Sequence, residues 1–351
     1  MEMITEIASM LAAQFQKPTL AFLIGGMVLA ALGSQFKMPD AIYKFIVIVL
    51  LLKVGLSAGI SVRNAEFSEL AVPALLAAAV GIVIVLIGTL TLARLRGVSR
   101  MDGMATAGLF GAVSASTLAA AMAELEAADI YYEAFIGALY PFMDIAALVT
   151  AIVLARMVAQ RQAAAVVQGD GTMTLSSGGL GLSGDGSMVR GILVDTFRSP
   201  AISALLLGLA IGFFANVGAI YESFYKQLFH GMLSLLMLIM GMEAWSRLSE
   251  LRKVAHAYVI YGLASPIVHG ALGFGAGLIA HQVTGFSAGG VVLLAVMAAS
   301  SSDISGPPTL RASLPEANPS AYVGTSTGLG TPIAILSIPL WMVLADVMIG
   351  F

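Results

Sequence analysis

Ten long apolar runs constrain the fold of this chain more than any other feature. A helix of about 20 mainly apolar residues crosses the hydrocarbon core of a bilayer. Charged residues make up only 11% of the sequence, whereas a typical soluble domain has about 25%. We therefore expect an all-α polytopic membrane protein with ten transmembrane helices. The expected spans are residues 18–36, 40–61, 70–95, 101–123, 133–158, 199–217, 228–248, 255–281, 287–310 and 320–350.

The ten runs form two halves that resemble each other. Pro18-Thr19-Leu20 at the start of the first run is echoed by Pro200-Ala201-Ile202 at the start of the sixth. Gly55, near the end of the second run, corresponds to Gly241 in the seventh. Because each half has five spans, an odd number, the second half enters the membrane from the opposite side. Such an inverted repeat underlies many secondary transporters.

These echoes divide the chain into three parts. We expect a first five-helix repeat at residues 1–158, a linker rich in Gly, Ala and Ser at 159–198, and a second, inverted repeat at 199–351. The linker has too little bulk to fold alone. Within residues 1–16, apolar side chains at helical spacing predict a short amphipathic helix at the membrane surface.

Lysine and arginine indicate the orientation, because cytoplasmic loops carry an excess of both. With the N-terminus outside, three of these residues lie in outer loops, Lys53 lies inside a span, and the others lie in inner loops. Both termini are therefore expected outside and the linker inside. The expected inner residues are Lys37, Lys44, Arg94, Arg96, Arg100, Arg156, Arg161, Arg190, Arg198, Arg247, Arg252, Lys253 and Arg311.

Two runs, the fourth of each half, are interrupted by small, hydroxylated and helix-breaking residues. The first interruption lies in 108–117 and the second in 300–309. A broken helix frees N–H and C=O groups that lipid cannot satisfy, so a break is tolerated only beside protein or a water-filled cavity. A matched pair of breaks points to a transporter's binding site. The expected helix-breaking residues are Gly108, Gly111, Gly306, Pro307 and Pro308.

Half-helix N-termini at the two breaks favour an anion, because their free N–H groups and helix dipoles present positive charge. Hydroxyl groups add donors, and their lone pairs also suit a cation. The alternative is that these small residues only permit close helix packing. The residues expected to bind the anion are Ala112, Ser114, Ala115, Ser116, Thr117, Ser301 and Ser302.

Asp303 is the only formal charge within the second break, and an ionisable group at that depth indicates function. We expect Na⁺ at Asp303, with Ser302, Ser305, Asp144 and Thr327 around it, and no organic cofactor. Asp144 has an equally plausible role as a structural partner of a broken helix.

Lys53 and Glu243 lie near the ends of the second and seventh spans. We expect Lys53 to extend its ammonium group to the membrane interface. The alternative is an ion pair between Lys53 and Glu243 across the pseudo-twofold axis.

Several functional classes are disfavoured by what the sequence lacks. It has no phosphate-binding GxxxxGK[ST] loop, no HExxH metal motif and no GxSxG elbow, so an ATP-driven motor and a hydrolase are not expected. An intramembrane protease with an Asp144–Asp303 pair is the enzyme alternative, but the hydroxyl-rich surroundings favour ligand binding, and we expect no enzyme. A net charge of −3 gives no basic stripe for nucleic acid.

At these residues the chain resembles the SbtA-type sodium-dependent bicarbonate transporters of carbon-concentrating bacteria. The resemblance rests on five segments that together span most of the chain: residues 18–27, 108–114, 137–144, 240–247 and 300–311. It departs at Ala115, where glycine is expected, and in the linker, which is shorter and less charged than in relatives.

The resemblance implies a sodium-dependent bicarbonate symporter in the plasma membrane of a bacterium. It implies a core domain (spans 3–5 and 8–10), which contains the crossed helices, and a gate domain (spans 1–2 and 6–7), assembled as a homotrimer. It also implies inhibition by a PII-like regulatory protein on the cytoplasmic face. The alternatives are a sodium-coupled symporter of another small anion, such as a monocarboxylate, an anion channel, and a membrane sensor without transport.

Overall fold

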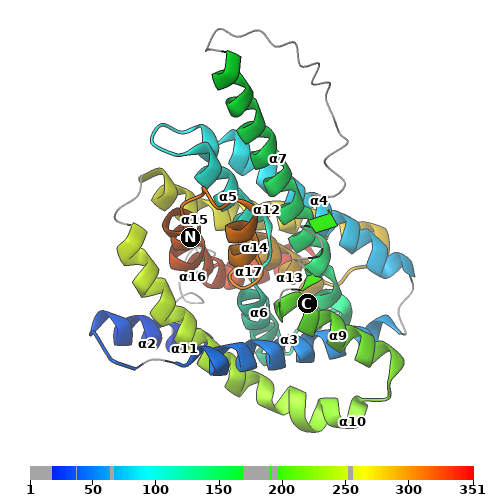
Figure 1. The fold of residues 1–351 in the computed structure, drawn as a ribbon. Coiled ribbons are helices and arrows are strands. Elements are labelled where there is room, and N and C mark those ends of the chain that lie inside the picture. The colour runs from blue at the N-terminus through cyan, green and yellow to red at the C-terminus, as the bar shows by residue number, and fades with distance from the viewer. Residues whose placement is uncertain are drawn as a thin grey trace.

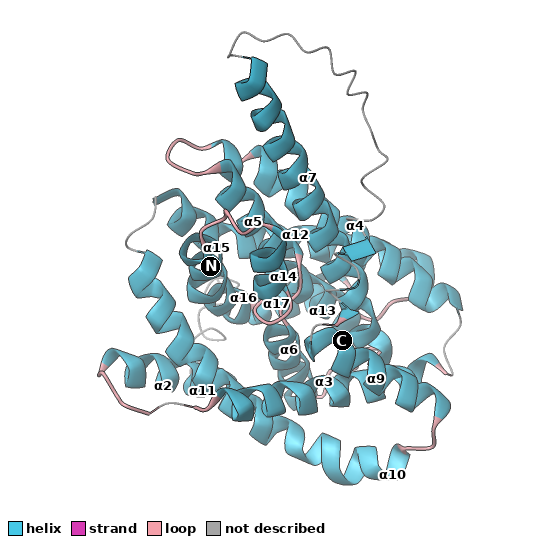
Figure 2. Cartoon of the chain, in the orientation of Figure 1, coloured by secondary structure: helices cyan, strands magenta, loops and turns pink. Residues whose placement is uncertain are grey.

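A computed structural model describes residues 18–36, 38–63, 67–168, 190–191, 194, 197–198, 200–251 and 256–351. Helices joined by short loops make up this part of the chain, and no strand occurs among these residues (Figure 2). The surface helix expected within residues 1–16 lies outside the described residues. So does most of the linker expected at 159–198, although residues 159–168 continue a helix.

The first half of the chain contains eight of the named helical segments (Figure 1). They are α2 (Pro18–Ala31), α3 (Asp40–Val62), α4 (Phe67–Leu90), η1 (Leu92–Arg94), α5 (Arg100–Gly111), α6 (Ala115–Ala127), η2 (Ala134–Leu139) and α7 (Tyr140–Gln168).

The second half includes two π-helical stretches, η4 and η5. Its segments are α9 (Pro200–Phe214), α10 (Gly218–Ile220), η4 (Tyr221–Tyr225), α11 (Lys226–Leu251), α12 (His256–Thr284), α13 (Ala288–Ala299), α14 (Gly306–Ser313), α15 (Pro319–Val323), η5 (Gly324–Gly330), α16 (Thr331–Leu336) and α17 (Ile338–Met348).

Seven helical segments in the described part of the chain are long and apolar enough to cross a membrane. Three further apolar helices are shorter, because α2, α9 and α13 have 14, 15 and 12 residues. Helix α2 ends before its apolar run does, and Gly33 just beyond it adopts a φ of +70° that helical residues do not use. Because it contains these spanning segments, the chain is a multi-pass membrane protein. The seven segments are Ala41–Val62, Glu69–Arg94, Arg100–Ala127, Ala134–Ala159, Gly218–Leu248, His256–Thr284 and Pro319–Met348.

Glycines bring two pairs of helices into close backbone contact. Helix α3 packs along α9 and α2 packs along α11, on the lower side of the view in Figure 1. A Cβ at Gly55 would overlap the backbone of α9 near Leu205, and one at Gly241 would overlap the backbone of α2 near Leu23. Small residues at helix interfaces permit this close approach in membranes, where van der Waals packing drives association.

The interrupted segments lie inside the molecule. Helix α5 packs against both α4 and α7, and α13 packs along α12. Every residue of α13 is buried, as are all those of α6 up to Leu125. The surrounding helices therefore shield the two breaks from lipid.

Candidate functional site

The first break separates α5 from α6. Gly111 ends α5, Ala112 and Ser114 adopt extended backbone conformations, and Ala115 begins α6. Ser114 is the N-cap of α6, and its Oγ accepts hydrogen bonds from the N–H (3.1 Å) and the hydroxyl (2.9 Å) of Thr117. Serine suits this position because its oxygen satisfies an N–H that the helix leaves free.

The second break separates α13 from α14. Helix α13 ends at Ala299, and residues 300–305 run without regular helix until α14 begins at Gly306. Pro307 and Pro308 follow at once, and proline is tolerated in the first helical turn because its missing N–H would have no helical partner there. The Gly306 N–H donates to Ser302 Oγ at 2.9 Å.

The two breaks satisfy each other's polar groups. The Ser114 N–H donates to Ser300 Oγ at 3.0 Å, and the Ser302 N–H donates to the Leu109 carbonyl at 2.8 Å. The Ser116 hydroxyl donates to Asp303 Oδ2. Backbone groups freed by one break are thus paired with the other, as burial requires.

Asp144 on α7 accepts hydrogen bonds from residues of both breaks. Its Oδ1 accepts the Val113 N–H at 3.1 Å, and its Oδ2 accepts the Ser305 hydroxyl at 3.0 Å. The Tyr140 and Ser305 hydroxyls lie 3.3 Å apart. Asp144 is fully buried and both of its oxygens are engaged, so in this structure it acts as a structural partner of the broken helices.

Asp303 differs from Asp144 in having one oxygen free. Ser116 holds its Oδ2, whereas its Oδ1 is buried and makes no hydrogen bond to any described residue. A buried acceptor without a hydrogen-bond partner raises the free energy of the folded state, and a buried carboxylate raises it more. The arrangement fits a cation beside Oδ1, because freed carbonyls and hydroxyls at helix breaks are the ligands that Na⁺ finds in such folds.

A hydroxyl group of η5 contacts the second break. Ser326 in η5 donates to Ser301 Oγ at 2.8 Å and lies 3.3 Å from the Ser302 carbonyl. Thr327, the residue expected near sodium, is also buried in η5, but no hydrogen bond joins it to Asp303 among the described residues. Ser326, Ser300 and Tyr140 also contact the breaks, although they are not among the site residues expected from sequence. A signal for Ser326 was its position in a Gly-flanked run of three hydroxyl residues inside an apolar span.

Aliphatic side chains of two other helices close the face of α6 that carries Ala115 and Ser116. These two residues and Ile304 line a cavity of only about 10 Å³. A space of this size is at the lower limit for one water molecule. The opposite wall consists of Val47, Leu50, Leu51 and Val54 of α3 and Leu236 of α11.

Comparison with protein families shows to which family the chain belongs. A family model described as the Na⁺-dependent bicarbonate transporter superfamily matches residues 18–346. The chain belongs to this superfamily. Among curated proteins, no match was found. Membership agrees with the resemblance, and it makes the chain a transporter-family protein whose family name specifies sodium and bicarbonate.

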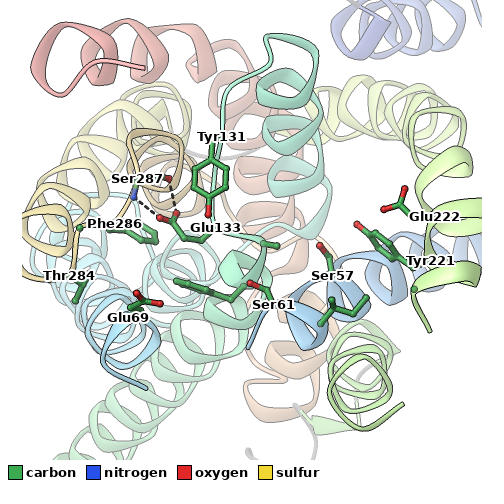
Figure 3. A pocket seen from close by; sticks show the side chains of 15 residues that line it. Ser57, Ser61, Glu69, Tyr131, Glu133, Tyr221, Glu222, Thr284, Phe286 and Ser287 are labelled. Atoms are coloured by element: carbon green, nitrogen blue, oxygen red, sulfur yellow. Dashed lines mark hydrogen bonds between the residues drawn. The ribbon is translucent and has the colours of Figure 1, made fainter. Parts of the chain in front are cut away.

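In this bicarbonate transporter superfamily member, a second, larger cavity lies at the ends of α6 and α13 that are remote from the breaks (Figure 3). Its volume is about 710 Å³, and Glu69, Glu133 and Glu222 contribute carboxylates to its lining. Glu133 is fixed in place, because its Oε1 accepts the Ser287 N–H at 2.6 Å and its Oε2 accepts the Ser287 hydroxyl at 2.8 Å. We call this cavity the acidic vestibule. Its negative groups favour cations over anions.

Lys53 does not extend to the membrane interface, and that expectation is wrong. Its side chain is 3% exposed, its Nζ lies 3.1 Å from Glu126 Oε1, and the ammonium group lies 3.8 Å from the centre of the Phe229 ring. An ion pair and an aromatic face compensate for its burial. The alternative partner, Glu243, instead lies 3.3 Å from Arg247 on its own helix.

Proposed function

We propose that this protein is a sodium-driven bicarbonate symporter that binds both ions between the two helix breaks. The observation that carries the proposal is the unequal environment of Asp303, whose Oδ2 is held by Ser116 while the buried Oδ1 has no partner among the described residues. A sodium ion at Oδ1 would neutralise the carboxylate. The hydroxyls of Ser302 and Ser305 lie 2.9 Å apart, and both residues are within two positions of Asp303 in sequence. We propose them as further oxygen ligands of the sodium ion.

The anion site is proposed beside the N-termini of α6 and α14, where helix dipoles favour negative charge. Neither break contains an arginine, which suits a small singly charged anion better than a dicarboxylate. Ala112 and Ala115, small buried residues at the first break, are proposed as further parts of this site. The proposed donors are Ser114, Ser116, Thr117, Ser301 and Ser302.

Sodium coupling supplies the driving force. Moving one negative charge into a cell that is negative inside costs about 2.3 kcal/mol per 100 mV. A co-transported sodium ion cancels this electrical term, and its own gradient then drives accumulation. If sodium at Asp303 neutralises the site, each ion raises the affinity for the other by the same factor.

Matching helix contacts support an inverted repeat of ten spans. On α9, the backbone that faces Gly55 includes Leu205 O and Leu209 N. On α2, the backbone that faces Gly241 includes Leu23 O and Met27 N. Counted from Pro200 and Pro18, the first residues of α9 and α2, these two atom sets occupy the same positions. The contact between spans 2 and 6 therefore has an equivalent between spans 1 and 7, as a pseudo-twofold axis requires.

We further propose that transport proceeds by alternating access, in which a core domain moves against a gate domain. The core comprises α4–α7 and α12–α17, and the gate comprises α2, α3 and α9–α11. The aliphatic wall over Ser116 belongs to the gate, so opening the site requires the two domains to separate. In the orientation with both termini outside, the acidic vestibule faces the exterior of a bacterial cell. Assembly as a homotrimer and control by a PII-like protein rest on the family resemblance alone.

Uptake of labelled bicarbonate into proteoliposomes tests the function. At fixed pH, an inward sodium gradient should drive saturable accumulation, and an equal potassium gradient should not. Accumulation that is equal with both cations would contradict sodium coupling. Absence of bicarbonate uptake by folded, inserted protein, together with sodium-dependent uptake of a monocarboxylate, would contradict the substrate.

A further inference from the structure

A third cavity lies away from the helix breaks, where the loop between α4 and α5 meets α7. Its volume is about 640 Å³. Thr89, Arg94 and Arg100 contribute polar groups to its lining, and the rest of the wall is almost entirely apolar. The apolar lining residues are Ala93, Leu95, Val98, Met104, Leu154, Met157 and Val158.

The polar groups of this cavity have no partner in the described part of the chain. Neither Arg94 nor Arg100 takes part in an ion pair there. The Thr89 hydroxyl is buried and makes no hydrogen bond. Asp102, the acid nearest in sequence to Arg100, directs its Oδ1 to the Asn318 N–H at 2.8 Å. The two exposed guanidinium groups and the buried Thr89 hydroxyl therefore have no protein acceptor among the described residues.

The cavity lies at an end of the apolar spans. Arg94 ends one candidate span and Arg100 begins the next, which places both at the boundary between hydrocarbon and water. Leu95 and Met157 are exposed on the surface beside them. A ligand that fits must carry negative charge at one end and apolar chains at the other.

We propose that this cavity binds an anionic phospholipid. Arg94 and Arg100 hold the phosphate, since guanidinium groups pair well with phosphate oxygens, and the Thr89 hydroxyl donates to the same group. The acyl chains lie along Leu154 and Met157. In the proposed orientation this is the cytoplasmic leaflet, where anionic lipids attract basic groups. The inference requires only that the chain spans a membrane, so it stands or falls independently of transport.

Lipid retention by the purified full-length protein tests the proposal. Protein reconstituted in nanodiscs of phosphatidylglycerol and phosphatidylcholine is extracted, and the bound lipid is quantified by native mass spectrometry. The Arg94→Gln/Arg100→Gln variant should retain roughly tenfold less phosphatidylglycerol, the loss expected for about one charge-assisted hydrogen bond. Arg96→Gln is the matched control, because Arg96 lies in the same loop but does not line the cavity.

One further variant and one competition measurement also test the lipid site. Thr89→Val removes only the hydroxyl that donates to the phosphate and should lower phosphatidylglycerol retention. Excess inorganic phosphate should leave the lipid bound, because phosphate lacks the acyl chains. Equal retention by the double variant and the Arg96→Gln control would overturn the proposal, as would complete displacement of the lipid by phosphate.

Discussion

The ammonium of Lys53 on α3 lies 3.1 Å from Glu126 Oε1 at the end of α6, and this ion pair joins the two proposed domains. Glu126 also accepts the Tyr132 hydroxyl at 2.6 Å, and His230 lies 3.7 Å from its other oxygen. Burial and the neighbouring Glu126 raise the pKa of Tyr132 in the loop after α6, so this phenol remains a neutral donor. The contact holds α3 against α6 in the state that the structure represents.

A double-mutant cycle should show strong coupling between these two residues. Removing either partner leaves a charge with reduced compensation, and Lys53 is the more buried of the two. Lys53→Met and Glu126→Gln should each lower the free energy of unfolding, and the double variant should recover part of the loss. We expect a coupling free energy of about 1–3 kcal/mol from unfolding in mixed micelles.

The pair Lys226–Glu222 is the matched control for this cycle. Its atoms lie 2.9 Å apart, but the side chains are 58% and 60% exposed. An exposed pair with this helical spacing should show a coupling of only about 0.3–0.5 kcal/mol. Equal coupling in both cycles would mean that burial does not strengthen the Lys53 contact.

Asp303→Asn should remove sodium dependence while leaving the fold intact. The amide keeps the size of the side chain and an oxygen for the Ser116 hydroxyl, but it loses the charge proposed to bind sodium. Sodium-driven bicarbonate uptake should fall roughly tenfold or more, as for loss of a charge-assisted contact. Asp346→Asn, at an exposed aspartate of α17, should transport as the unmodified protein does. Full sodium-dependent uptake by Asp303→Asn would remove Asp303 from the mechanism.

Asp144→Ala, in contrast, should lower the thermal stability of the protein. It leaves the buried Val113 N–H without its acceptor and forces the Ser305 hydroxyl to donate to Ser302 Oγ or the Tyr140 hydroxyl instead. An unsatisfied buried N–H costs about 1–3 kcal/mol, so the unfolding midpoint should drop. Asp144→Asn should be milder, because its amide oxygen still accepts the Val113 N–H. An Asp144→Ala protein with unchanged thermal stability would contradict the structural role.

The positions of the breaks were predictable from sequence, whereas the rotation of the helices around them was not. Glycine, serine and proline have strong local preferences, so the end of α5 at Gly111 and the start of α14 at Gly306 lie inside the segments singled out. Among Thr325, Ser326 and Thr327, the residue that reaches the second break depends on the helix period. The π-helical geometry of η5 changes that period, and Ser326 makes the contact. The partner of Lys53 is 73 residues away in sequence, and only tertiary packing brings it close.

Gly26→Ala should disrupt the contact between α2 and α11, whereas Gly25→Ala should not. A Cβ at Gly26 would overlap the backbone of α11 at Leu238, but a Cβ at Gly25 would meet no atom within 4 Å. Overpacking of this kind costs about 1–3 kcal/mol. Gly25→Ala should be neutral or stabilising by up to about 1 kcal/mol, because alanine favours helix. Thermal unfolding of the two neighbouring variants distinguishes these outcomes, and equal midpoints would contradict the close approach at Gly26.

Cross-linking tests the proposed motion of core against gate, and the chain suits it because its sequence contains no cysteine. Leu51 of α3 and Ala119 of α6 line the same cavity of about 10 Å³, so cysteines at both positions lie within reach of a short thiol cross-linker. The cross-linked Leu51→Cys/Ala119→Cys protein should lose uptake, and a reducible linker should allow its recovery after reduction.

A cross-link inside the proposed core separates loss of motion from damage by the reagent. A Cβ at Gly277 on α12 would lie 3.0 Å from the Val291 Cα and 3.2 Å from the Val291 Cβ on α13, so the thiols of Gly277→Cys/Val291→Cys lie close together after a shift of a few tenths of an ångström between the helices. Uptake by this double variant before cross-linking is therefore its reference. Both helices belong to the core and move together in alternating access, so this cross-link should leave uptake unchanged. Full uptake with the first pair locked would contradict the separation of α3 from α6. Loss of uptake with both pairs locked would mean that transport needs movement inside the core as well, contrary to a rigid core that moves past a gate.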